Sequence, residues 1–167
     1  MMNNMNESQS IYQLDELMTQ TRKLAAQYRL KTGQILPISN ELAKYDVQYI
    51  LSLKLPMGQL NLKSVDCIDP EKNIAFQVKS RVVFKANAPQ RVGQLNISGD
   101  WDQTLLVIYD DSYQPNEIYA LEKSVLLNLE HSQPKHNPNK NKRGALSVGK
   151  FKVLSKLIWS SVDGLIG

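Results

Sequence analysis

The sequence contains a single cysteine, Cys67, among 167 residues. One cysteine excludes a disulfide within the chain and fits a reducing compartment, so we expect a cytoplasmic protein. No apolar run approaches the ~18–20 residues that a membrane span requires, so we expect no membrane partner. Residues 1–10 are polar and lack the apolar segment of a secretory signal, and we expect a disordered tail there.

Two long segments each lack charges of one sign: one has no acidic residue and the other has no basic residue. Residues 131–162 contain seven Lys or Arg and no acid, whereas residues 100–122 contain six acids and no base. A basic segment on a mixed chain suggests contact with a polyanion, nucleic acid first, although a solvated lysine-rich loop explains the charge equally well. The DNA-binding candidates are Arg81, Lys135, Lys140, Lys142, Arg143 and Lys150.

The length fits one domain, over residues 11–167. Apolar spacing predicts a helix over 11–31, ended by Gly33, and a second over about 40–53 that begins near Ser39. Residues 58–68 alternate weakly and lead through the turn DPEKN (69–73) into a strand over 74–84, so the two segments predict a hairpin.

The second half of the chain predicts further strands and closing helices. Residues 91–97 predict a short strand or a bend, and TLLVIY (104–109) predicts a strand covered on both faces. A strand over 116–121, a helix over 122–130, a polar loop over 132–143 and a helix over about 148–158 follow. The order predicts an α+β fold with a mixed sheet flanked by helices, in a sandwich-like arrangement.

The strand FQVKSR (76–81) carries a polar residue at every second position. Because strand side chains alternate, Gln77, Lys79 and Arg81 share one face. A four-residue connection places Cys67 opposite Phe76 and Asp66 opposite Gln77, which gathers Asp66, Gln77 and Lys79 on one side. A half-buried strand with a solvated polar face is the alternative interpretation.

An acid, an amide oxygen and a lysine together form a chemically useful set. Carboxylate and amide oxygens bind hard divalent cations such as Mg²⁺ or Mn²⁺, which polarise a phosphoryl group and activate water. The lysine orients or deprotonates that water, or stabilises the developing charge. The sequence therefore predicts a phosphoryl-transfer site.

The Asp66…Gln77-x-Lys79 motif resembles the site of the PD-(D/E)XK nuclease superfamily. The blocks TGQILPISNEL, VDCI, FQVKSR, GDWDQTLLVIYDD, EIYAL and RGALSVGKFKVLSKLIW are similar, in order, to those of a small bacterial domain of that superfamily, over about residues 17–159. The resemblance implies a restriction-endonuclease-like core and a further metal-site carboxylate at Glu41. The usual acidic residue of the motif is here Gln77, a neutral ligand.

Three hypotheses follow. The first is a metal-dependent nuclease that hydrolyses DNA phosphodiester bonds, with Asp66, Gln77, Lys79 and Glu41 at its site. The second is a catalytically inactive DNA-binding module of the same fold. The third, half of a helix-turn-helix over 34–53, is disfavoured because its supposed recognition helix carries little positive charge. A homodimer is compatible with the sequence.

Overall fold

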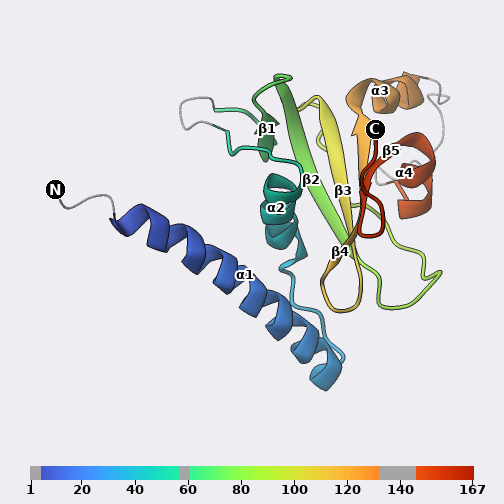
Figure 1. Ribbon diagram of the computed structural model, residues 1–167. Coiled ribbons are helices and arrows are strands. Elements are labelled where there is room, and N and C mark those ends of the chain that lie inside the picture. Colours follow the sequence, from blue (N-terminus) through green and yellow to red (C-terminus); the bar gives the residue numbers. More distant parts are fainter. Residues whose placement is uncertain (1–4, 57–60, 132–145) are drawn as a thin grey trace.

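The computed structural model describes residues 5–56, 61–131 and 146–167, with side chains from residue 13 onward. Two helices come first, α1 (Met5–Thr32) and α2 (Ser39–Ile50). The other elements are β1 (Cys67–Asp69), β2 (Ile74–Val82), β3 (Gln103–Tyr109), β4 (Pro115–Glu122), α3 (Lys123–His131), α4 (Val148–Leu154), β5 (Lys156–Ser160) and β6 (Gly164–Leu165). The predicted α+β fold is confirmed (Figure 1).

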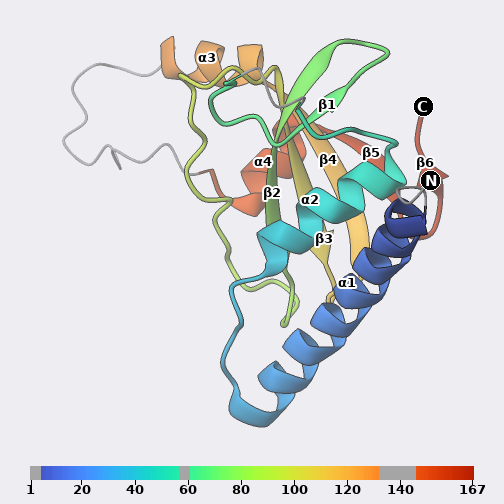
Figure 2. The same cartoon turned by 90° about the vertical axis from the view of Figure 1, so that its left-hand side faces the viewer.

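A mixed sheet organises the fold. In the described part of the chain it has six strands in the order β1-β2-β3-β4-β5-β6. Only the β2–β3 pair among them is parallel, so residues 83–102 carry the chain from the end of β2 back to the start of β3. Helices α1 and α2 cover one face of the sheet, and α3 and α4 cover the other (Figures 1 and 2).

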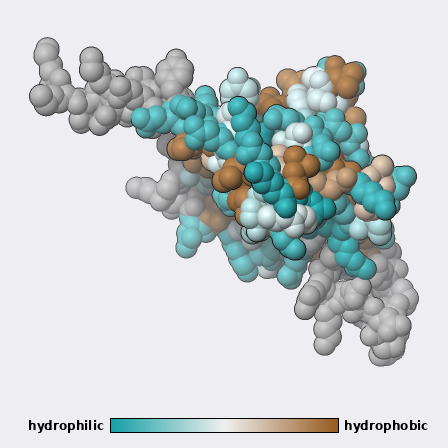
Figure 3. Space-filling model, turned by 90° about the horizontal axis from the view of Figure 1, so that it is seen from below, coloured by the Kyte–Doolittle hydropathy of each residue, from teal (hydrophilic) through white to brown (hydrophobic). Residues whose placement is uncertain are grey.

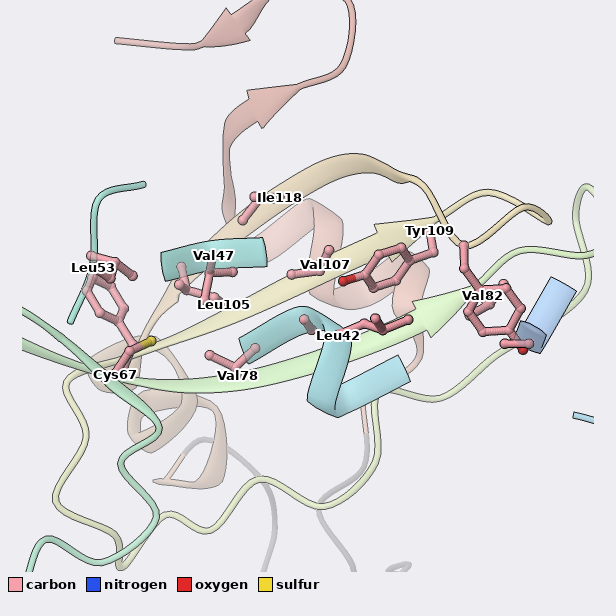
Figure 4. Packing of buried hydrophobic residues seen from close by; sticks show 14 residues of the cluster. Leu42, Val47, Leu53, Cys67, Val78, Val82, Leu105, Val107, Tyr109 and Ile118 are labelled. Carbon is pink, nitrogen blue, oxygen red and sulfur yellow. The ribbon is translucent and has the colours of Figure 1, made fainter. Parts of the chain in front are cut away.

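Each face of the sheet has its own hydrophobic core, and β3 contributes to both. Its odd-numbered residues Leu105, Val107 and Tyr109 pack beneath α2, while Leu106 and Ile108 pack beneath α3 and α4. The first core also contains the apolar stripe of α2 and three residues of β2, Phe76, Val78 and Val82 (Figure 4). Burial on both faces explains the continuous apolar run of β3, as predicted.

A buried ion pair attaches α1 to α2 and to the sheet. The Arg22 guanidinium donates to both carboxylate oxygens of Asp46, at 2.9 and 2.6 Å, and to the Tyr113 carbonyl oxygen at 2.7 Å. The Tyr109 hydroxyl donates to Asp46 as well. A bidentate arginine fixes geometry as well as charge, so this network sets where α1 lies on the domain.

The ends of several elements differ from the prediction. Helix α1 begins at Met5, inside the segment expected to be disordered. The strand predicted over 58–68 is wrong for most of its described length, because only Cys67–Asp69 forms a ladder, joined by one bridge between Lys54 and Ile68. Residues 91–97 make one bridge, from Arg91 to Ser147. The predicted loop over 132–143 lies outside the described residues.

The helix predicted over 148–158 is also wrong at its C-terminal end. Ser147 caps α4 as predicted, with its side chain accepting from the Lys150 amide, but the helix ends at Leu154 and β5 follows. Leu157 and Ile158 then pack on opposite faces of the sheet, which their helical spacing did not indicate. No helix within the described ranges is long and apolar enough to cross a bilayer.

Candidate functional site

The β1–β2 hairpin has the register that the sequence predicts. Cys67 pairs with Phe76 and Asp69 with Ile74. The Asp69 carboxylate accepts from the amides of Glu71 and Lys72, at 2.9 and 3.1 Å, which closes the turn. Because Asp69 performs the turn's hydrogen bonding, Asp66 has no role in the turn.

Asp66 immediately precedes β1, at the point beyond which β2 has no strand partner on this edge among the described residues. Its amide donates to the Phe76 carbonyl oxygen at 2.8 Å, and its carboxylate Oδ2 accepts from the Val78 amide at 2.7 Å. The carboxylate thus satisfies a β2 amide that a longer β1 would have paired. The side chain is 24% exposed, and its other carboxylate oxygen, Oδ1, lies 3.8 Å from the Lys44 ammonium.

Gln77 and Lys79 share the face of β2 that is turned away from α2, because their neighbours Phe76 and Val78 pack beneath α2. Gln77 is 5% exposed, and its Oε1 has no hydrogen-bond partner among the described residues. A buried amide oxygen without a partner is costly, and such an atom is a ready ligand for a cation.

Lys79 is half-buried at the same edge. Burial lowers the pKa of its ammonium; the charge of Asp66 opposes this shift, and the charges of Arg81 and Lys44 add to it. A lowered lysine pKa makes the neutral amine, which accepts protons, easier to populate. Asp66 and Lys79 thus affect each other through charge, without an ion pair between them in the described part of the chain.

Glu41 lies on α2, on the other side of the sheet from Gln77 and Lys79. Its side chain is 71% exposed. Lys44 connects Glu41 to Asp66: its Nζ lies 3.0 Å from Glu41 Oε1 and 3.8 Å from Asp66 Oδ1. Burial lowers the pKa of Lys44, but the two carboxylates outweigh burial and leave that pKa raised.

Lys44 is a site residue that the sequence reasoning missed. The available signal was its spacing, since a lysine three residues after Glu41 shares one face of a helix with it. Its position is distinctive because one ammonium lies between the two carboxylates that the resemblance assigns to a metal and offsets part of their charge.

The nucleic-acid candidates are only partly described. Arg81 donates through Nε to the Arg91 carbonyl oxygen and through Nη1 to its neighbour Ser80, and burial lowers its pKa. This side chain therefore anchors the crossover segment rather than presenting itself to a ligand. Lys150 is exposed in the first turn of α4. The other four, Lys135, Lys140, Lys142 and Arg143, lie outside the described residues.

The donor set fits a hard divalent cation in its chemistry. Asp66 offers a carboxylate oxygen and Gln77 an amide oxygen without a partner, and oxygen ligands of these kinds suit Mg²⁺ or Mn²⁺. Within residues 13–56, 61–131 and 146–167 no group of three or more His, Cys, Asp or Glu is placed to hold a metal. A cation shared by Asp66 and Glu41 would have to displace Lys44, which occupies the space between them.

The chain matches no protein-family model, and it matches no curated protein.

Proposed function

We propose that this protein hydrolyses DNA phosphodiester bonds with a divalent metal held at the free edge of β2. The observation that carries the proposal is Lys79, a half-buried lysine of lowered pKa that senses the charge of Asp66, on the same face of β2 as a buried Gln77 amide oxygen with no described partner. Perturbed ionisable groups at an edge with free ligands are typical of catalytic sites. The D…QxK spacing adds support through its resemblance to PD-(D/E)XK nucleases.

Each residue has a distinct role in this proposal. Asp66 and Gln77 hold Mg²⁺ or Mn²⁺, and Glu41 assists once Lys44 has moved from between the carboxylates. When bound, the cation supplies positive charge at the phosphate oxygens and acidifies water. Lys79, as the neutral amine, takes the proton of the attacking water as the water oxygen bonds to phosphorus. The bond from phosphorus to the leaving sugar oxygen breaks, and that oxygen is protonated from solvent.

A cleavage assay tests the proposal. Purified protein is incubated with single-stranded, nicked and duplex DNA in Mg²⁺, in Mn²⁺ and in EDTA, beside Lys79→Ala and Asp66→Asn. We expect metal-dependent cleavage, a loss of roughly 10²-fold or more for Lys79→Ala, and no cleavage by Asp66→Asn. The asparagine keeps an oxygen to accept from the Val78 amide, so this variant should fold.

A matched control uses Lys72→Ala, which removes an exposed lysine from the hairpin turn. It should cleave as wild type does, and equal residual activity in all variants would identify a contaminating nuclease. Inactivity of wild type and of Gln77→Glu on every substrate and metal, with no metal bound by calorimetry, would refute the nuclease.

A DNA-binding module without catalysis is the second candidate, and the Lys44 bridge favours it. A lysine that already contacts both Glu41 and Asp66 offsets part of their charge and so reduces the electrostatic need for a metal. This candidate requires duplex DNA to bind in EDTA, without any need for Mg²⁺, and to remain uncleaved in both conditions. Affinity should fall steeply with salt, and neutralising Lys135, Lys140, Lys142 and Arg143 should reduce the log–log slope by about 0.9 per lost contact.

A further inference from the structure

Helix α1 carries an apolar stripe that the described chain leaves largely uncovered. Leu14, Leu17, Leu24 and Tyr28 are 45, 56, 60 and 38% exposed, and Thr21 lies between them. The core-facing side of the helix is a different stripe, formed by Arg22 and Ala25 with Met18. The N-terminal half of α1 extends away from the sheet (Figures 1 and 2), and hydrophobic side chains reach the surface on the underside of the molecule (Figure 3).

The spacing of this stripe is that of a coiled-coil seam. Positions 14, 17, 21, 24 and 28 follow one another at intervals of three and four residues, which keeps them on one side of a helix that supercoils with another. The seam from Leu14 to Tyr28 is about 21 Å long.

The charges of α1 select the direction of that facing helix. Every acid of α1 precedes Thr21 and every base follows it: Glu7, Asp15 and Glu16 come first, and Lys23, Arg29 and Lys31 come after, together with Arg22, which is already paired with Asp46 in the interior. A second copy in the antiparallel direction sets each acidic half beside a basic half and opposes the two helix dipoles. A parallel copy sets like charges side by side.

We propose that α1 pairs with α1 of a second copy of this chain in an antiparallel, two-fold symmetric coiled coil. A register centred between Arg22 and Lys23 places Leu17 opposite Tyr28 of the second copy and Leu24 opposite its Thr21. One patch then serves both partners, as a two-fold axis requires. This pairing is independent of the nuclease proposal, because it involves no residue at the edge of β2.

Sedimentation over a range of concentrations tests the pairing. Wild type should convert reversibly from a 19.0-kDa monomer to a species of twice that mass. Leu17→Ser with Leu24→Ser should remain monomeric while keeping the helical signal and melting temperature of dilute, monomeric wild type, because both side chains are exposed in the monomer. Leu30→Ser is the matched control: it lies on the same helix, is 85% exposed, falls outside the seam and should leave the dimer unchanged.

Disulfide trapping tests the direction. Leu17→Cys with Tyr28→Cys should form covalent dimers under mild oxidation, whereas Leu17→Cys alone should not; the buried Cys67 does not compete. Dimers trapped by Leu17→Cys alone would overturn the antiparallel direction. A wild type that stays monomeric throughout, or equal loss of the dimer in Leu30→Ser, would overturn the pairing. If wild type is monomeric and binds DNA, and only the Leu17→Ser with Leu24→Ser variant loses that binding, the seam would be assigned to nucleic acid instead.

Discussion

The Lys44 ammonium lies 3.8 Å from the Asp66 carboxylate, across the edge between α2 and the β1–β2 hairpin. The same ammonium contacts Glu41 at 3.0 Å. Lys44 therefore occupies the position, between two carboxylates, that a cation shared by Asp66 and Glu41 would occupy. Metal binding and the Lys44 ion pairs are alternatives, and metal affinity should depend on Lys44.

Lys44→Met should tighten the binding of Mg²⁺ or Mn²⁺ several-fold, because the substitution removes the competing charge and keeps the length of the side chain. Calorimetry measures the affinity, and the rise in melting temperature on adding metal provides a second readout. Lys72→Met removes the same charge from the exposed turn and controls for net charge. Equal affinities in the two variants would contradict competition at Lys44.

Gln77→Glu should lower the melting temperature of the metal-free protein and increase the stabilisation gained from metal. Position 77 is 5% exposed, so an added carboxylate is costly there unless a cation or a proton neutralises it. With a cation bound, the carboxylate is a stronger ligand than the amide. A loss of stability that metal does not restore would argue against a metal at this face.

Lys79→Met should melt at a higher temperature than wild type at pH 7. Burial lowers the pKa of Lys79 in the folded protein, so the folded state disfavours the ammonium that the unfolded state accepts freely. This cost is present below the folded pKa and disappears as pH rises to the ordinary value of 10.5. The difference in melting temperature should therefore shrink toward pH 10.5. A difference that is constant with pH would show that packing, not charge, causes it.

Asp46→Ala should destabilise the fold by about 3–5 kcal/mol, because it leaves the buried Arg22 guanidinium without its counter-ion. Urea denaturation measures the free energy of unfolding. Asp111→Ala, on an exposed turn, is the control and should cost little. A loss below about 1 kcal/mol would mean that water replaces Asp46 around Arg22.

Cys67 should resist thiol reagents in the native state. Burial and the neighbouring Asp66 raise the pKa of this thiol to about 12, so at pH 8 almost none of it is the reactive thiolate. Labelling should match the rate of unfolding and should accelerate in urea. Rapid stoichiometric labelling of the folded protein would contradict the burial of Cys67 beneath α2.

The sequence predicted the elements whose local pattern agrees with their final environment. The turn residues of DPEKN predicted the hairpin register correctly, and the apolar run of β3 correctly predicted a strand buried on both faces. The end of α4 was not predictable from spacing, because Leu154, Leu157 and Ile158 suit a helix as well as a strand. Pairing of β5 with β4 decides between them, and that contact lies far away in the sequence.

The candidate site was predicted unevenly for a similar reason. Alternation placed Gln77 and Lys79 on one face, but it did not reveal that α2 covers the other face and carries Glu41 there. The role of Lys44 arises only when α2 packs beside the hairpin. Its pairing with Asp66 joins residues 22 positions apart, for which a single sequence gives no signal.

The parallel pairing of β2 with β3 has a consequence for the order of folding. Gln77 pairs with Thr104, so this ladder closes only after the crossover segment has been brought over the sheet, and closing such a loop is entropically slow. The antiparallel β3–β4 hairpin needs only the short turn at Asp110 and Tyr113 and should form earlier. The β1–β2 hairpin, which carries Asp66, Gln77 and Lys79, should also form early, whereas its docking on β3 should come in the late, rate-limiting step.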